Sequence, residues 1–368
     1  MSTKRESERD RLEKKRQANI EMLRIILMCT IPLYHLMLYN GVLFRDFQGN
    51  VLLGLIFSVG GAIPADYAFM AISAYFLQRD GTRFQIQRVL RFAALLITMY
   101  VIKAGILRGL FGFHNTEYFV DFFLMEGAWW YAKGYLVLLC IYPFLNQFLE
   151  RVSKRILIGT AAILGMGIQA ACIWNKMNLA ADLAAFVFVY IVMGLLRKKE
   201  YRSYLGIRVT KRSMIGFTVV CYLVLLALGI CIRIPQGVMS GSIGIEILKR
   251  IIGRYNLIAA FMGIAVFLAA RLVNIEPARW IYRLSASTSY VFLLHDPVMG
   301  VFWYFGKCWN DLAGYSSGAF LVWTTLYLVT CFGIALIVEQ VYQSWIAPLW
   351  EKLIQRVCVR WKEERTEK

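Results

Sequence analysis

Residues 20–44 read IEMLRIILMCTIPLYHLMLYNGVLF, a run of 25 residues in which Glu21, Arg24 and His35 are the only acidic, basic or histidine residues. A helix needs about 20 consecutive apolar residues to cross the hydrocarbon core of a bilayer. Ten such stretches follow one another along the chain, so we expect an all-α polytopic integral membrane protein. They lie at 20–44, 50–77, 86–110, 128–149, 155–174, 179–196, 213–232, 255–273, 285–306 and 318–342.

The composition agrees with a bilayer as the solvent. Hydrophobic residues make up 59% of the 368 residues and charged residues 17%, against about 45–50% and about 25% in soluble domains. These values exclude a cytosolic enzyme, a secreted domain and a disordered chain. The eight cysteines form no CxxC or CxxH pair, so we expect neither a metal site nor a disulfide framework.

The net charge of +18 is concentrated on one side of the expected membrane. Of the 41 Lys and Arg residues, 30 lie in the two tails and in every second connection, as the positive-inside rule requires of cytoplasmic segments. We therefore expect both termini in the cytoplasm and no nucleic-acid partner. Connection 233–254 departs from the rule, because it is basic although it should face outside. The expected organisation is a basic tail (1–18), a membrane domain (19–345) and a second basic tail (346–368).

The ionisable residues of the first stretch form a polar stripe on one helix face. Arg24 and His35 are eleven residues apart, which is about 20° beyond three full turns and about 16 Å along the axis. Glu21 precedes Arg24 by three residues, a spacing that allows an ion pair. Charges inside a bilayer cost several kcal/mol, so this stripe is a candidate functional site. Two alternatives remain open: Glu21 and Arg24 as an interfacial anchor, and His35 as a packing residue rather than a proton-transfer group.

A second histidine lies within an expected span, in SYVFLLHDPVMG (289–300). Pro297 has no backbone N–H, so it frees a carbonyl in the preceding turn and can bend the helix. His295 either orients a substrate or acts as a second acid–base group, or it makes a packing hydrogen bond between helices. The remaining histidine, His114, is expected in a solvated external connection.

Asp66 follows GGAIPA (60–65), where Gly-Gly and Pro predict an irregular segment that lines a cavity. Asp66 either belongs to that cavity or pairs with a neighbouring helix, and Lys103 is one candidate partner. Arg88 and Arg91 share a face at the cytoplasmic start of the third stretch, with Arg83 just before them. Guanidinium groups form forked bonds with phosphate oxygens, although the same pattern is typical of an ordinary positive-inside anchor.

Several segments together resemble the membrane-bound acyltransferase family 3, whose members acylate carbohydrates at the cell surface. NIEMLRIILMCTIPLYHLMLYNG (19–41) matches the first helix of the family, which carries an Arg, ten further residues and a His. Residues 88–91 match its Arg-x-x-Arg pair, and SAYFL (73–77) resembles its Ser-Gly-Phe/Tyr-Leu stretch with Ala74 in place of Gly. WWYAKGYLVLLCIYPFLN (129–146) and SYVFLLHDPV (289–298) are similar to its Trp-rich fourth helix and its late His segment. The resemblance covers about residues 19–345.

The resemblance implies a multi-pass O-acyltransferase of the bacterial cell membrane. Its donor is an acyl-CoA, most simply acetyl-CoA, and its acceptor is an extracytoplasmic polysaccharide or lipid-linked sugar. His35 is implied as the general base or a transient acyl acceptor, and the other catalytic residues are Arg24, Glu21 and His295. The residues implied to hold the CoA phosphates are Arg83, Arg88 and Arg91.

The substrate-binding residues that we carry over are Asp66, Ser73, Tyr75, Trp130 and Tyr135. Asp66 sits one residue away from the acidic position common in the family. The aromatic residues near the outer side, among them Trp129, Trp130 and Tyr135, either stack on sugar rings or belong to the aromatic belt at the membrane interface.

Two other classes of function compete with acyl transfer. A proton-coupled transporter or flippase could use the same polar stripe without chemistry, although transporters often have repeated halves with paired broken helices, and the sequence has no such pairing. A membrane scaffold would give no reason for Arg, Glu and His on one buried face.

Overall fold

The computed structural model describes residues 17–39, 50–59, 61–111, 129–174, 178–197, 209–231, 255–295 and 316–366. Every regular element in these ranges is a helix. The elements are α2 (Ala18–Tyr39), α3 (Val51–Val59), α4 (Ala62–Leu77), α5 (Ile86–Phe111), α7 (Trp130–Arg151), α8 (Lys154–Ile173), α9 (Leu179–Arg197), α11 (Lys211–Cys231), α13 (Leu257–Arg271), α14 (Arg279–His295), α16 (Ser317–Val341), the π-helical η3 (Tyr342–Ile346) and α17 (Ala347–Thr366). His114, connection 233–254 and the part of the ninth stretch after His295 lie outside the described residues.

Six helices in the described part are long and apolar enough to cross a bilayer, and α4 and α13 are shorter apolar helices. The six are Ala18–Met37, Trp130–Arg151, Lys154–Ile173, Leu179–Arg197, Lys211–Cys231 and Ser317–Val359. The all-helical, multi-pass membrane protein is therefore confirmed, whereas the count of ten and the side of the termini stay predictions. Helix α3 ends at Val59 and α4 begins at Ala62, so the break expected near the Gly-Gly pair is confirmed.

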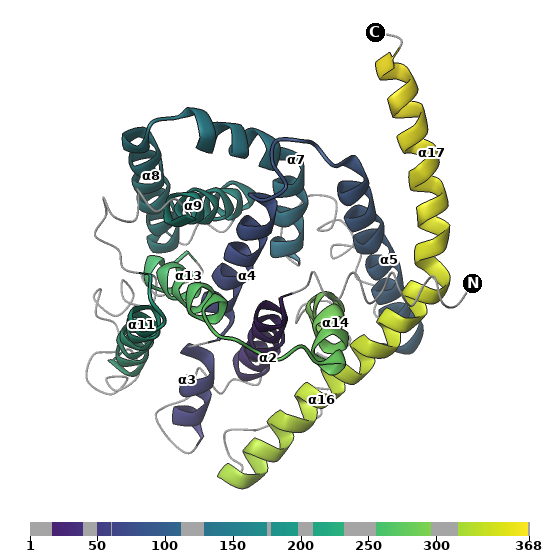
Figure 1. Ribbon diagram of the computed structural model, residues 1–368. Coiled ribbons are helices and arrows are strands. Elements are labelled where there is room, and N and C mark those ends of the chain that lie inside the picture. The colour runs from purple at the N-terminus through teal and green to yellow at the C-terminus, as the bar shows by residue number, and fades with distance from the viewer. Residues whose placement is uncertain are drawn as a thin grey trace.

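Helix α2 lies inside the bundle (Figure 1), in contact with α3, α4, α13, α14 and α16. The amide of Asn19 donates to the carbonyls of Ala270 and Arg271 at 3.0 and 3.2 Å, which satisfies two carbonyls at the end of α13. Helices α13 and α4 approach closely, because a Cβ on Gly263 would stand 2.5 Å from the carbonyl oxygen of Pro64. The bonds of Asn19 therefore fix the position of α2 along α13, and α13 in turn packs closely on α4.

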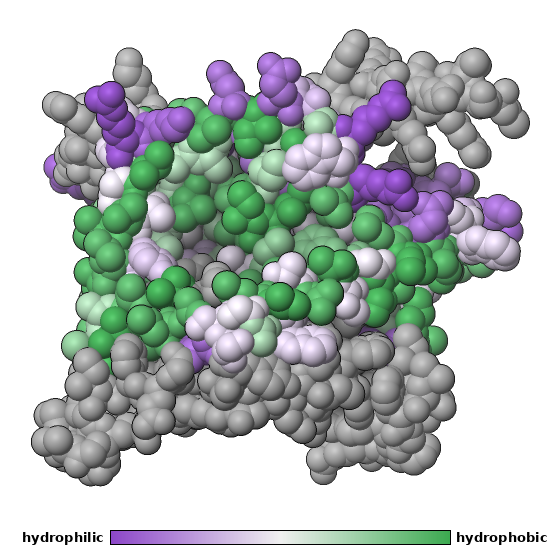
Figure 2. All heavy atoms as spheres, turned by 90° about the horizontal axis from the view of Figure 1, so that it is seen from below, coloured by the Kyte–Doolittle hydropathy of each residue, from purple (hydrophilic) through white to green (hydrophobic). Residues whose placement is uncertain are grey.

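The outward faces of the bundle are apolar. Figure 2 shows a broad hydrophobic band, with hydrophilic side chains gathered along one of its edges. Exposed apolar side chains on the outer helices include Ile163 and Met166 of α8, Val220 of α11, and Val329 and Ile337 of α16. Such a surface suits lipid chains, which supports a bilayer environment.

Helix α17 runs crosswise to α2 and α14, which Figure 1 shows foreshortened while α17 lies lengthwise. It continues from α16 through η3 and packs on α5. Ile354 and Cys358 are buried, whereas Leu349, Leu353 and Val357 form an exposed apolar row at a spacing of four residues. This arrangement suits an amphipathic helix that lies along the membrane interface.

Candidate active site

Two histidines that are 260 residues apart in the sequence meet inside the bundle. Nδ1 of His35 on α2 lies 3.0 Å from Nε2 of His295 at the end of α14. Their rings stack with 5.1 Å between centroids and 25° between planes. His295 is buried and His35 is half-buried. His35 is therefore the more accessible of the two rings.

The hydrogen bonds of this pair determine where the protons lie. Nδ1 of His295 is 2.9 Å from the carbonyl oxygen of Val291, and a carbonyl can only accept, so this nitrogen carries the hydrogen. Nε2 of a neutral His295 then accepts from Nδ1–H of His35. The lone pair of a neutral His35 is consequently on Nε2. This is the arrangement that a general base requires, with one nitrogen oriented by a partner and the other able to take a proton.

A second contact joins α2 and α14 nearer the start of both helices. The hydroxyl of Ser285 donates to Oε2 of Glu21, which also lies 3.5 Å from Nη1 of Arg24. The ion pair expected between Glu21 and Arg24 is therefore confirmed. Since Glu21 faces Ser285 and His35 faces His295, the two helices run parallel and align their polar residues.

A cavity of about 220 Å³ lies between α2, α4, α5, α7 and α14. Four of the residues predicted for the site line it: Arg24, Asp66, Ser73 and Tyr135. It is also lined by Ile31 on α2 and Phe292 on α14, each about one helical turn before the histidine of its helix. The histidine pair therefore stands just beyond one end of this small cavity.

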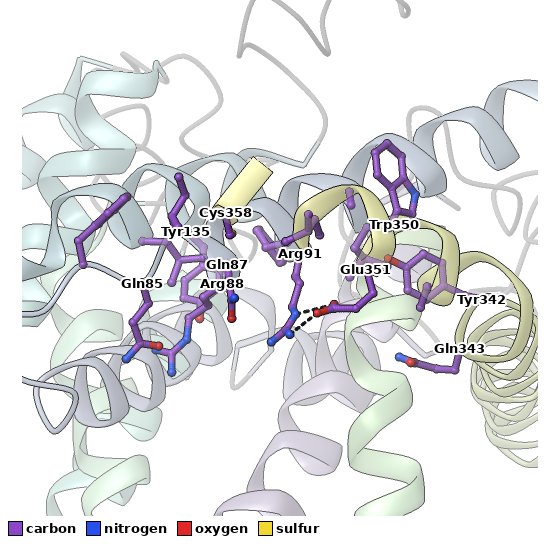
Figure 3. Close-up of a pocket in the computed structure, with 18 of the residues that line it drawn as sticks. Gln85, Gln87, Arg88, Arg91, Tyr135, Tyr342, Gln343, Trp350, Glu351 and Cys358 are labelled. Atoms are coloured by element: carbon purple, nitrogen blue, oxygen red, sulfur yellow. Dashed lines mark hydrogen bonds and ion pairs between the residues drawn. The ribbon is translucent and has the colours of Figure 1, made fainter. Parts of the chain in front are cut away.

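A second cavity, of about 1420 Å³, opens between α5, η3 and α17 (Figure 3). Arg83, Arg88 and Arg91 all line it. Its other wall comes from the C-terminal part of the chain and includes Tyr342, Gln343, Trp350 and Glu351. A cavity of this size with three guanidinium groups can accept a large anionic ligand.

Phe92 and Tyr135 line both cavities and therefore stand between them. Their rings meet edge to face, with 5.1 Å between centroids and 88° between planes. A ligand that reaches from the large cavity into the small one has to pass these two side chains.

Two of the three arginines bind carboxylates of this chain. Arg91 donates from Nε and Nη2 to the two carboxylate oxygens of Glu351 at 2.9 and 2.6 Å, as the dashed lines in Figure 3 show. Nη1 of Arg88 forms an ion pair with Asp80. Both arginines are partly exposed, so these pairs are weak and water can compete for them.

The loop that carries Asp80 and Arg83 is held on α7 and α9. The amide of Asn146 donates to the carbonyls of Leu77 and Gly81 at 3.0 and 2.6 Å, and its oxygen accepts from the hydroxyl of Tyr190 at 2.7 Å. The hydroxyl of Tyr142 donates to the carbonyl of Arg83 at 2.6 Å. These hydrogen bonds to backbone carbonyls restrict the loop, so they also position Arg83 and Asp80, the partner of Arg88.

The remaining predicted residues lie elsewhere. Tyr75 is not among the lining residues of the two cavities; the guanidinium groups of Arg79 and Arg271 lie over its ring, at 5.4 and 4.8 Å from the centroid. Trp130 packs edge to face on Tyr131 and is not among the lining residues of the two cavities. In the part of the chain that the structure describes, no three His, Cys, Asp or Glu side chains stand together as ligands for a metal ion.

Sequence reasoning missed several residues of this arrangement, namely Phe92, Asn146, Ser285 and Glu351. Ser285 gave no usable signal, because ten residues correspond to about 1000°, which places it about 80° away from His295 around the helix. Asn146 is a polar residue at the end of an apolar helix, which is informative. Glu351 gave no sequence signal of its role, since charged residues are common in solvated tails.

Comparison with known proteins identifies the class. The acyltransferase 3 family, described as an acyltransferase domain, matches residues 17–339. The chain belongs to this family, which confirms the resemblance, and it is a membrane acyltransferase. No curated protein and no solved structure matches the chain.

Proposed function

We propose that this membrane acyltransferase moves an acyl group, most simply acetyl, from cytoplasmic acyl-CoA to a hydroxyl of an extracytoplasmic polysaccharide or lipid-linked sugar. The observation that carries the proposal is the order of parts: an arginine-lined cavity, an aromatic pair, a small cavity and an oriented histidine. A long donor with an anionic end and a reactive thioester end matches this order.

In the proposed reaction the donor binds with its phosphates at Arg83, Arg88 and Arg91, and its pantetheine arm passes Phe92 and Tyr135. Nε2 of His35 takes the proton of the acceptor hydroxyl as its oxygen bonds to the acyl carbonyl carbon. The C–S bond then breaks, and the CoA thiolate receives the proton from His35. In the two-step alternative, Nε2 of His35 attacks the thioester carbon and the C–S bond breaks to release the CoA thiolate; the acceptor hydroxyl then takes the acyl group from His35, and its proton passes to the thiolate.

Arg24 acts at a different place from His35 in this scheme. The two residues are about 16 Å apart along α2, so no single reacting atom touches both. Arg24 lines the small cavity instead, where its charge faces the donor arm, and Glu21 and Ser285 orient it.

The test is consumption of radiolabelled acetyl-CoA by purified protein in nanodiscs, with and without glycan acceptors. Wild type should release CoA, His35→Ala should not, and Arg88→Ala/Arg91→Ala should raise the KM for the donor. A trapped labelled protein would indicate the two-step route. If a panel of acyl-CoAs and glycans gives neither binding nor turnover, the proposal is wrong and transport becomes the leading function.

A further inference from the structure

The last described turn of α14 contains a carbonyl whose usual helical partner the sequence removes. In an α-helix the carbonyl of residue 293 accepts from the N–H of residue 297. Position 297 is proline, which has no N–H. A buried carbonyl without a donor is costly within a membrane, so another group has to supply the hydrogen bond.

Trp129 supplies it. Its indole Nε1–H donates to the carbonyl oxygen of Leu293 at 3.0 Å, and both residues are buried. Trp129 is the residue directly before α7, far from α14 in the sequence. The bond therefore ties the start of one helix to the end of another.

The surroundings hold Trp129 in an unusual conformation. Its φ of 62° and ψ of 26° are left-handed, and it is the only non-glycine residue with positive φ among those described. Tryptophan rarely adopts this region, which recurs at functional sites when the surrounding structure enforces it. The buried Nζ of Lys103 lies 4.5 Å from the centroid of its ring, a cation–π contact that fixes the ring from α5.

We propose that Trp129 is a positioning residue for the histidine pair, in which its indole N–H replaces the donor that Pro297 lacks. Leu293 lies in the turn between Val291, which accepts from His295, and His295 itself. Holding that turn fixes the ring of His295, and His295 in turn orients Nδ1 of His35. The catalytic consequence rests on the function proposed above.

The experiment compares three changes in full-length protein in nanodiscs. Trp129→Phe removes the N–H and keeps a ring beside Lys103. Replacing Trp129 by 3-benzothienylalanine keeps the bicyclic shape and removes only the N–H, which covers the case that Trp129→Phe fails to fold. Trp129→Phe/Pro297→Ala returns a backbone N–H four positions after Leu293. Trp174→Phe, at an exposed tryptophan, is the matched control.

Two readouts are followed: kcat and KM for acetyl-CoA, and the ring ¹⁵N resonances of the three histidines in ¹⁵N-histidine-labelled protein. Loss of the N–H should lower kcat about 5- to 100-fold with little change in KM. It should also shift the signals of His35 and His295, and Pro297→Ala should restore both readouts in part. The control should change neither.

The proposal is overturned if the benzothienyl variant retains the wild-type kcat and histidine resonances. It is also overturned if the benzothienyl variant loses rate while the resonances of His35 and His295 keep their wild-type positions, because the loss then does not act through the histidine pair. If wild type transfers no acyl group, the proposed function fails. The resonances still decide whether Trp129 holds the histidine pair.

Discussion

Two regions differ in how their polar groups are paired: the interior, where α2 contacts α14, and the lining of the large cavity at Arg88 and Arg91, here called the rim. In the interior, polar groups of α2 meet polar groups of α14, whereas at the rim arginines of α5 meet carboxylates from a loop and from α17. The side chain of Glu21 is 5% exposed, while that of Arg91 is 55% exposed. In the low dielectric of the interior an unpaired polar group is costly, so each polar group keeps its hydrogen-bond partner. At the rim water and salt compete, so the partners can be exchanged for a ligand. The interior therefore suits catalysis and the rim suits reversible binding.

The largest effect should come from the interior. His35→Ala should lower kcat about 10²- to 10⁴-fold, because it removes the group that we propose takes the proton, while the KM for acetyl-CoA changes little. Steady-state kinetics in nanodiscs measure both values. His114→Ala is the control. A His35→Ala variant with wild-type kcat would rule out this residue as base and as acyl acceptor.

Loss of the other interior contact, between Ser285 and Glu21, should lower the stability of the protein as well as its rate of acyl transfer. Ser285→Ala removes a donor from the buried carboxylate of Glu21 and should lower the free energy of unfolding by about 1–3 kcal/mol. Ser287→Ala is matched to it, because among the described residues this buried hydroxyl bonds within α14, to the carbonyl of Leu284 at 2.8 Å. Denaturant unfolding in the same detergent compares the two. Equal losses would mean that the link between α2 and α14 is not special.

At the rim the effect should appear in KM and depend on salt. Arg88→Gln should raise the KM for acetyl-CoA about 3- to 10-fold and leave kcat nearly unchanged, since in the proposed reaction the charge contacts the donor before and after acyl transfer alike. Raising the ionic strength should increase the KM of wild type more than that of the variant. An unchanged KM at low salt would place the donor phosphates elsewhere.

The smallest effect should come from Glu351→Gln, which removes the carboxylate that Arg91 now binds. If this carboxylate competes with the phosphates, the KM for acetyl-CoA should fall by about two- to fivefold, the size expected of an exposed pair. Glu150→Gln, an exposed carboxylate at the end of α7, is the control. A higher KM would show instead that the pair supports the shape of the cavity.

The predictable part of this site follows from the cost of polar groups in hydrocarbon. Glu21, Arg24 and His35 were recognisable because few ionisable residues occur in that stretch, and helical spacing placed them on one face. The break before α4 was recognisable from two glycines and a proline. The fourth and ninth stretches were found as apolar runs. Trp129 and Ser285 within them carried no signal of the partners that they bind.

The class of protein, the polar stripe of the first stretch and the acyltransferase family were thus determined by the sequence, because apolar length, helical period and motif spacing are local properties of the chain. Tertiary structure alone decided that His35 meets His295, that Trp129 satisfies Leu293 and that Arg91 binds Glu351. Each of these contacts joins helices distant in the chain. Their formation depends on how whole helix faces pack, and the spacing within one helix does not determine that packing.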